Sequence, residues 1–76
     1  MITLAGINER VLDEVRRSEE IHGPYHSQHE AYAVLLEEVD EYWQEVKRRV
    51  RTPGRARDEL IQIAAVAMRA AMMPDA

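Results

Sequence analysis

An all-α fold is predicted for this chain of 76 residues. Apolar side chains recur at steps of three and four residues through three long segments, which is typical of helices that bury one face. Two turn sequences, His22-Gly23-Pro24 and Thr52-Pro53-Gly54, separate these segments. Strands are not expected. We therefore predict a single domain over residues 1–76, in which three helices form a bundle.

The first helix is expected from about residue 4 to about residue 21. Its apolar positions follow helical spacing and are Leu4, Ile7, Val11, Leu12 and Val15. Gly23 suits the position just after a helix end, and Pro24 cannot continue a helix. The helix is thus predicted to end just before this pair.

The second helix is expected from about residue 28 to about residue 51. Ser27 and Glu30 form a predicted capping box, in which the Ser27 hydroxyl accepts from the Glu30 amide and the Glu30 carboxylate accepts from the Ser27 amide. The apolar stripe of this helix is predicted to pack in the core, and it comprises Leu35, Val39, Tyr42, Val46 and Val50, widened by Tyr32, Leu36 and Trp43.

The third helix is expected from about residue 55 to about residue 73, before Pro74. Between Ile63 and Met73 its only charged residue is Arg69. A helix that is apolar on nearly every face is a buried helix. In so small a protein, this predicts burial by a partner subunit.

Composition limits the function classes. The chain has no cysteine and a net charge of −4, which disfavours duplex nucleic acid as a partner because phosphate contacts need a basic surface. No apolar run approaches the roughly 20 residues that span a bilayer, and the N-terminus lacks the basic start of a signal peptide. A chain this small is marginally stable alone, and oligomerisation is a common remedy. We expect a cytoplasmic protein without membrane or nucleic-acid partners.

Acidic residues on the second helix lack the cations expected on a solvated surface. Glu37, Glu38 and Glu41 have no lysine or arginine three or four positions ahead. Glu37 and Glu41 are like charges one turn apart, as are Glu41 and Glu45, and each such pair costs about 0.2–0.5 kcal/mol. Glu45 differs, because two arginines follow it by one turn, as expected for a surface acid.

The third helix carries Asp58 and Glu59 near its start, beside its own apolar stripe. If the second and third helices pack antiparallel, the two acidic edges face a shared pocket. Carboxylates from two helices suit Mg²⁺, a hard cation that takes oxygen ligands and shares them with substrate phosphates. From spacing alone, a metal site and a solvated acidic face both remain open.

The two acidic motifs resemble a known signature. Glu37-Glu38-x-x-Glu41 followed by Glu59-x-x-Gln62 resembles the paired EExxE and ExxD motifs of the MazG-like all-α nucleoside triphosphate pyrophosphohydrolases. The flanking helical sequences at residues 29–38 and 59–68 resemble the phage and bacterial branch of that family. The resemblance covers about residues 10–72.

The resemblance implies a helical bundle that assembles into homodimers or homotetramers. It also implies Mg²⁺-dependent hydrolysis of an NTP or dNTP to the monophosphate and pyrophosphate, with Mn²⁺ as a possible substitute. Carried over by position, Glu38, Glu41, Glu59 and Gln62 would ligate the metal. Glu37 and Glu38 would be catalytic, with Glu37 either a further ligand or the base that orients water.

Two departures from the family pattern matter. Gln62 stands where the motif has aspartate; its amide oxygen can ligate a metal but brings no charge. Family members commonly have a fourth helix, so a partner subunit would have to complete the bundle here. These departures favour two alternatives to an enzyme, which are a nucleotide-binding or regulatory relative without turnover and a structural helical interaction module.

Four further residues are candidates for contacting the substrate. The loop after the first helix resembles the segment that follows that helix in relatives, so His22 and Tyr25 are candidates to lie beside the nucleotide, although a capping or packing role is favoured for Tyr25. Lys47 and Arg55 belong to a basic stretch around the second turn. Its cations complement a helix C-terminus, or they capture triphosphate charge.

Overall fold

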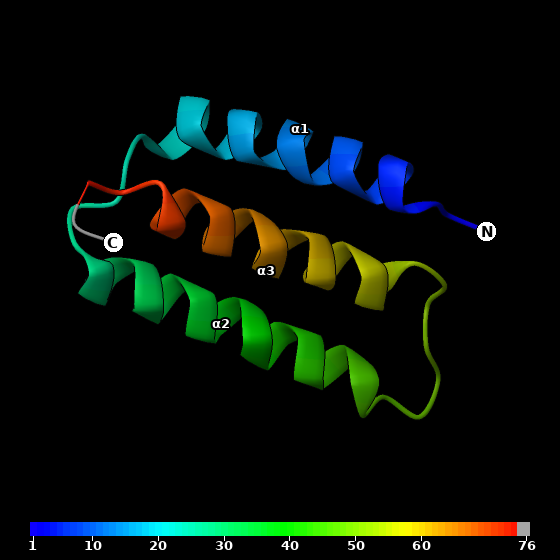
Figure 1. The fold of residues 1–76 in the computed structure, drawn as a ribbon. Coiled ribbons are helices and arrows are strands. Elements are labelled where there is room, and N and C mark those ends of the chain that lie inside the picture. The colour runs from blue at the N-terminus through cyan, green and yellow to red at the C-terminus, as the bar shows by residue number, and fades with distance from the viewer. Residues whose placement is uncertain (75–76) are drawn as a thin grey trace.

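The computed structural model describes residues 1–74, and residues 75–76 of the predicted domain lie outside this part. Three helices follow one another, α1 (Leu4–His22), α2 (Gln28–Val46) and α3 (Arg55–Ala71). No strand occurs in residues 1–74 (Figure 1). The predicted all-α class is confirmed. No helix within the described residues is long and apolar enough to cross a membrane.

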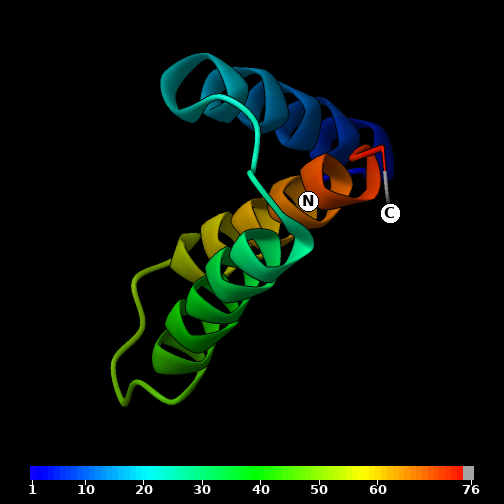
Figure 2. The same cartoon turned by 90° about the vertical axis from the view of Figure 1, so that its left-hand side faces the viewer.

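The central element of the bundle is α3. It packs against both other helices, whereas α1 and α2 do not pack against each other. Along the chain direction, α2 runs antiparallel to α3 and α1 runs parallel to it (Figure 1). Seen from the end, α3 lies between α1 and α2 (Figure 2). The antiparallel packing of α2 on α3 is the condition under which their acidic edges meet.

The core is small and joins α1 to α3. It consists of Val11 and Val15 from α1 with Ile61 and Ala65 from α3. Among the described residues, no large side chain is completely removed from solvent. Burial of a Val or Ile side chain stabilises the fold by about 1.5–3 kcal/mol relative to exposure. Because only a few such side chains are buried here, the hydrophobic stabilisation of a single chain is modest.

The end of α1 and the start of α2 follow the sequence closely. Gly23 ends α1 in a positive-φ conformation (φ 69°), and its amide donates to the Glu19 carbonyl. At the start of α2, the Glu30 amide donates to the Ser27 hydroxyl at 3.1 Å. The second half of the predicted capping box is wrong, because the Glu30 carboxylate accepts from the His26 amide instead, at 3.2 Å.

Two helix ends differ from the prediction. The second helix ends at Val46 rather than near residue 51. Arg51 folds back and donates to the Val46 carbonyl at 2.9 Å, and Thr52 is biased away from helical geometry because Pro53 follows it. The third helix ends at Ala71 rather than near residue 73, since Pro74 imposes the same bias on the residue before it.

Only part of the predicted core stripe of α2 faces inward. Leu35, Tyr42 and Val46 are partly buried, but the other edge of that stripe lies outside the core. Four of its large apolar side chains, called here the α2 apolar stripe, are exposed: Tyr32 by 65%, Leu36 by 52%, Val39 by 43% and Trp43 by 54%. The two buried residues of α2 are Ala31 and Glu45. The small alanine allows α3 to approach on that side, about a quarter turn from the stripe.

The helix α3 is also less covered than its composition predicts. Leu60 is 46% exposed and Met68 is 37% exposed. Within one chain, α3 is therefore not buried on all sides, and an apolar surface faces outward from both α2 and α3.

Candidate functional site

Three glutamates from two helices meet between α2 and α3. Glu38 and Glu41 are one turn apart on α2, and Glu59 lies in the second turn of α3. One carboxylate oxygen from each lies within 4.8 Å of the others. Because α2 ends where α3 begins, the antiparallel pair brings the end of the first acidic motif to the start of the second. The sequence predicted this grouping, and Glu37 stands exposed next to it on α2.

The carboxylates of this cluster lie in surroundings that disfavour their ionised form. Burial, followed by the negative charges of Glu41 and Glu59, raises the pKa of Glu38 to about 7. Burial and the neighbouring Glu41 also raise the pKa of Glu59, and the charge of Arg55 opposes that rise. Buried like charges disfavour ionisation in this way unless a cation compensates them.

One oxygen of the cluster has no protein partner. Oε2 of Glu38 is buried and accepts no hydrogen bond from the described residues. A buried acceptor without a partner costs about 1–3 kcal/mol. Three convergent carboxylates and an oxygen that lacks a donor match the chemistry of a hard divalent cation. Glu38, Glu41 and Glu59 therefore fit such an ion.

A pocket adjoins the glutamate cluster, and two arginines bring positive charge to it. It has a volume of about 230 Å³ and is lined by Glu41, Gln44, Glu45, Arg48, Arg55 and Glu59. Glu45 is only 5% exposed. Its carboxylate pairs with Arg48 at 2.9 Å and with Arg55 at 3.8 Å. The sequence interpretation of Glu45 as a surface acid is wrong; its position seven residues after Glu38, on the same helix edge, was the available signal.

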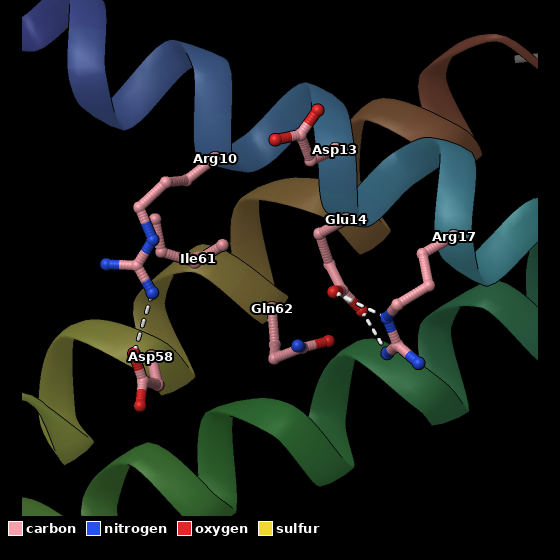
Figure 3. A pocket seen from close by; sticks show the side chains of 7 residues that line it. All are labelled: Arg10, Asp13, Glu14, Arg17, Asp58, Ile61 and Gln62. Carbon is pink, nitrogen blue, oxygen red and sulfur yellow. Dashed lines mark hydrogen bonds and ion pairs between the residues drawn. The ribbon is translucent and has the colours of Figure 1, made fainter.

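The fourth predicted ligand lies elsewhere. Gln62 lines a pocket between α1 and α3, where its amide lies beside Glu14 (Figure 3). Arg17, with a contribution from Gln62, lowers the pKa of Glu14. The neighbouring Asp58 is bound by Arg10 at 2.8 Å. Of the four predicted metal ligands, three meet in the glutamate cluster, and Gln62 is placed with α1.

The predicted substrate loop is anchored by a residue that sequence reasoning did not select. Arg69 of α3 is 7% exposed. It donates to the Gly23 carbonyl at 2.6 Å and to the Tyr25 hydroxyl at 3.2 Å. Its guanidinium also lies over the Tyr25 ring, 4.2 Å from the centroid. The signal was visible in the sequence, because Arg69 is the lone charge in an apolar run.

This anchor forms one wall of a further pocket of about 310 Å³. The pocket lies between the loop and α2 and is lined by His22, Gly23, Pro24, Tyr25, His26, Glu30, Val34 and Arg69. Val34 precedes Glu38 by one helical turn, so this pocket and the glutamate cluster follow the same side of α2. His22 and Tyr25 both line this pocket. Lys47 instead lies over the Trp43 ring, 6.0 Å from its centroid.

No family model, curated protein or solved structure matches this chain.

Proposed function

We propose that this protein is a Mg²⁺-dependent nucleoside triphosphate pyrophosphohydrolase, which converts an NTP or dNTP to the monophosphate and pyrophosphate. The observation that carries the proposal is the cluster of Glu38, Glu41 and Glu59, with its unpartnered Glu38 oxygen. Two arginines in the adjoining pocket supply positive charge for phosphates. The reaction itself is inferred from the resemblance of the two acidic motifs to those of MazG-like enzymes.

Each residue of the site has a role in this proposal. Glu38, Glu41 and Glu59 would hold Mg²⁺, or Mn²⁺ in its place. An ion held there would supply positive charge that offsets the negative charge developing on the phosphates. Glu37, exposed beside Glu38, accepts the proton of the attacking water. The water oxygen forms a bond to the α-phosphorus, the bond to the bridging oxygen breaks, and pyrophosphate leaves with that electron pair.

The pocket at the loop is proposed to receive the nucleoside. Tyr25 offers an aromatic face that is held still by Arg69, and His22 lies at the edge of the same pocket. Stacking on a fixed aromatic ring is worth about 1–3 kcal/mol per base and tolerates every base. The phosphates then extend along α2 toward the glutamates and Arg55. The proposed location is the cytoplasm, because its nucleoside triphosphates would be the substrates.

The proposal is tested by the products of the reaction. Incubated with Mg²⁺ and a panel of NTPs and dNTPs, the protein is expected to release pyrophosphate and a monophosphate, and excess EDTA is expected to stop the release. Chromatography of the nucleotide products distinguishes this reaction from γ-phosphate hydrolysis, which yields a diphosphate. Diphosphate as the product, or no product from any nucleotide, would contradict the proposal.

One observation favours a second candidate, a nucleotide binder without turnover. Gln62 lies beside Glu14 rather than in the cluster, which leaves three carboxylates for the metal. A binder and an enzyme both gain thermal stability from Mg²⁺ with nucleotide, since a ligand that binds only the folded state stabilises it. Stabilisation without any product would identify the binder. Absence of both would favour a structural helical module.

We further propose that the protein works as a homodimer or homotetramer, with a second copy covering the α2 apolar stripe. The chain exposes 5772 Å² of surface, whereas a typical monomer of 8.8 kDa exposes about 4,800 Å². The excess of about 1,000 Å² is close to the roughly 800 Å² that each partner buries in a stable interface. A second copy presents the same stripe and satisfies both surfaces at once.

A charge at the centre of the stripe is expected to separate the subunits. Val39→Glu places a carboxylate in the proposed interface, where it would be buried without a partner. Sedimentation equilibrium should give a mass of at least twice 8.8 kDa for the wild type and the monomer mass for the variant. Ala33→Glu, exposed on the same helix, adds the same charge away from the stripe and should leave the assembly intact. A monomeric wild type at tens of micromolar would refute the interface.

A further inference from the structure

We propose that Glu45 is a positioning residue that holds Arg48 and Arg55 as a clamp for the pyrophosphate end of the substrate. The inference rests on the proposed function and adds to it the way in which the leaving group is recognised. It starts from a carboxylate that is almost completely buried and still ionically paired at the edge of the glutamate cluster.

Burial makes the pairing of Glu45 obligatory. At 5% exposure, its carboxylate has lost most of its water, and a buried charge is tolerated only when it is paired. The pairs come from both sides of the connection between the helices: Arg48 follows the end of α2, and Arg55 opens α3. Glu45 therefore pairs closely with Arg48 and more loosely with Arg55, two cations that lie on a turn and at a helix start.

The geometry of the pairs leaves the outer ends of both guanidiniums available. Each arginine approaches Glu45 through Nε, Arg48 at 2.9 Å and Arg55 at 3.8 Å. A guanidinium has four further N–H groups on its two terminal nitrogens. Both arginine side chains remain about half exposed, 54% and 53%. Planar groups held at one edge and open at the other suit bidentate binding of phosphate.

The two arginines face the same pocket as the glutamates. That pocket is lined by Glu41 and Glu59 as well as by Arg48 and Arg55, and Arg55 is close enough to Glu59 to oppose the rise of its pKa. A polyphosphate whose α-phosphate meets the glutamate-bound cation would thus extend its far end toward the arginines. There they would stabilise the charge that collects on pyrophosphate as its bond to the α-phosphorus breaks.

The balance of charges in the pocket makes binding conditional on the metal. Three carboxylates and two guanidiniums line it, so without a cation the pocket carries one net negative charge and repels phosphates. A divalent cation adds two positive charges; with its third ligand, Glu38, counted as ionised, the net charge becomes zero and the repulsion is removed. Pyrophosphate and the cation are therefore expected to strengthen each other's binding, and by linkage the effect is reciprocal.

The experiment is a calorimetric titration of the full-length protein with inorganic pyrophosphate, with and without Mg²⁺. Glu45→Gln is decisive because it removes a negative charge. A purely electrostatic role predicts tighter binding of the anion by this variant, whereas a positioning role predicts weaker binding. We expect Glu45→Gln to bind pyrophosphate about tenfold more weakly, because misplaced arginines lose charge-assisted hydrogen bonds to the anion.

Two matched pairs of variants control the interpretation. Asp40→Asn, at an exposed position of α2, changes the net charge by the same amount as Glu45→Gln and should not weaken binding. Arg48→Met is expected to lower the affinity about tenfold or more, whereas Arg49→Met, an exposed neighbour that removes the same charge, should change it less than twofold. Circular dichroism melting establishes that each variant is folded at the titration temperature.

The outcomes separate the clamp from the proposed function. Pyrophosphate binding that depends on Glu45, Arg48 and Mg²⁺ supports the clamp even if no nucleotide is hydrolysed, in which case the proposed function alone fails. Hydrolysis with an unchanged KM in Glu45→Gln overturns the clamp and leaves the function standing. Equal losses in Arg48→Met and Arg49→Met, or tighter binding by Glu45→Gln, also overturn it.

Discussion

Glu38→Gln is expected to lower the rate of pyrophosphate release by about 10²–10³-fold or more, the loss typical of removing one group that stabilises transition-state charge. Glutamine keeps the shape of the side chain and removes its charge, so the cluster retains two carboxylates. The measurement is kcat in saturating Mg²⁺ by a coupled pyrophosphate assay. Asp40→Asn, on the same helix and exposed, is the matched control and should retain full activity.

The pH dependence provides an independent check on the same residue. Since the pKa of Glu38 is raised to about 7, the folded protein binds more protons than the unfolded chain between pH 4.5 and 7. The free energy of unfolding without metal is therefore expected to fall as pH rises through that window. Stabilisation by Mg²⁺ should grow over the same window, because the proton and the metal compete. Thermal melts of Glu38→Gln should show both trends reduced to the part that Glu59, whose pKa is also raised, contributes; undiminished trends would assign the titration to another group.

Arg69→Met is expected to destabilise the fold by about 2–4 kcal/mol, the range for losing charged hydrogen bonds and leaving a buried acceptor unpaired. The variant removes the donors of the Gly23 carbonyl and the Tyr25 hydroxyl together with the cation–π contact. The connection between α1 and α2 would thereby lose its attachment to α3.

Urea denaturation gives the free energy of unfolding for this test. Arg16→Met serves as the control, because Arg16 is 74% exposed and its nearest carboxylate oxygen, on Asp13, is 3.7 Å away. Such surface pairs contribute about 0–1 kcal/mol. If Arg69→Met and Arg16→Met change the stability equally, Arg69 does not anchor the loop.

Local sequence rules predict the fold class and most helix boundaries. Gly23, Ser27 and Pro53 act through their own backbone geometry or through bonds to residues within one turn, so their effect is readable from the chain alone. The glutamate cluster was predictable for a related reason. Helical spacing places Glu38 and Glu41 on one edge of α2, and only one further step, antiparallel packing, brings Glu59 to them.

The spacing of apolar residues along α2 does not determine how this helix is rotated about its own axis. An apolar stripe can face the core or a partner, and only packing against α3 decides between them. Here α3 packs on the side of Ala31, so Glu45 is buried although its arginine neighbours resemble those of a surface acid. The environment of Gln62 depends likewise on α1, whose distance along the chain hides the contact with Glu14 from any local rule.

The absence of packing between α1 and α2 has a consequence for the order of assembly. The α2–α3 hairpin closes one short connection, whereas docking of α1 joins distant parts of the chain, such as Arg10 and Asp58, which are 48 positions apart. Short closures form first, since they cost less chain entropy. The glutamate cluster lies wholly on that hairpin, so the short connection is expected to bring its three members together before α1 docks and completes the core with Val11 and Val15.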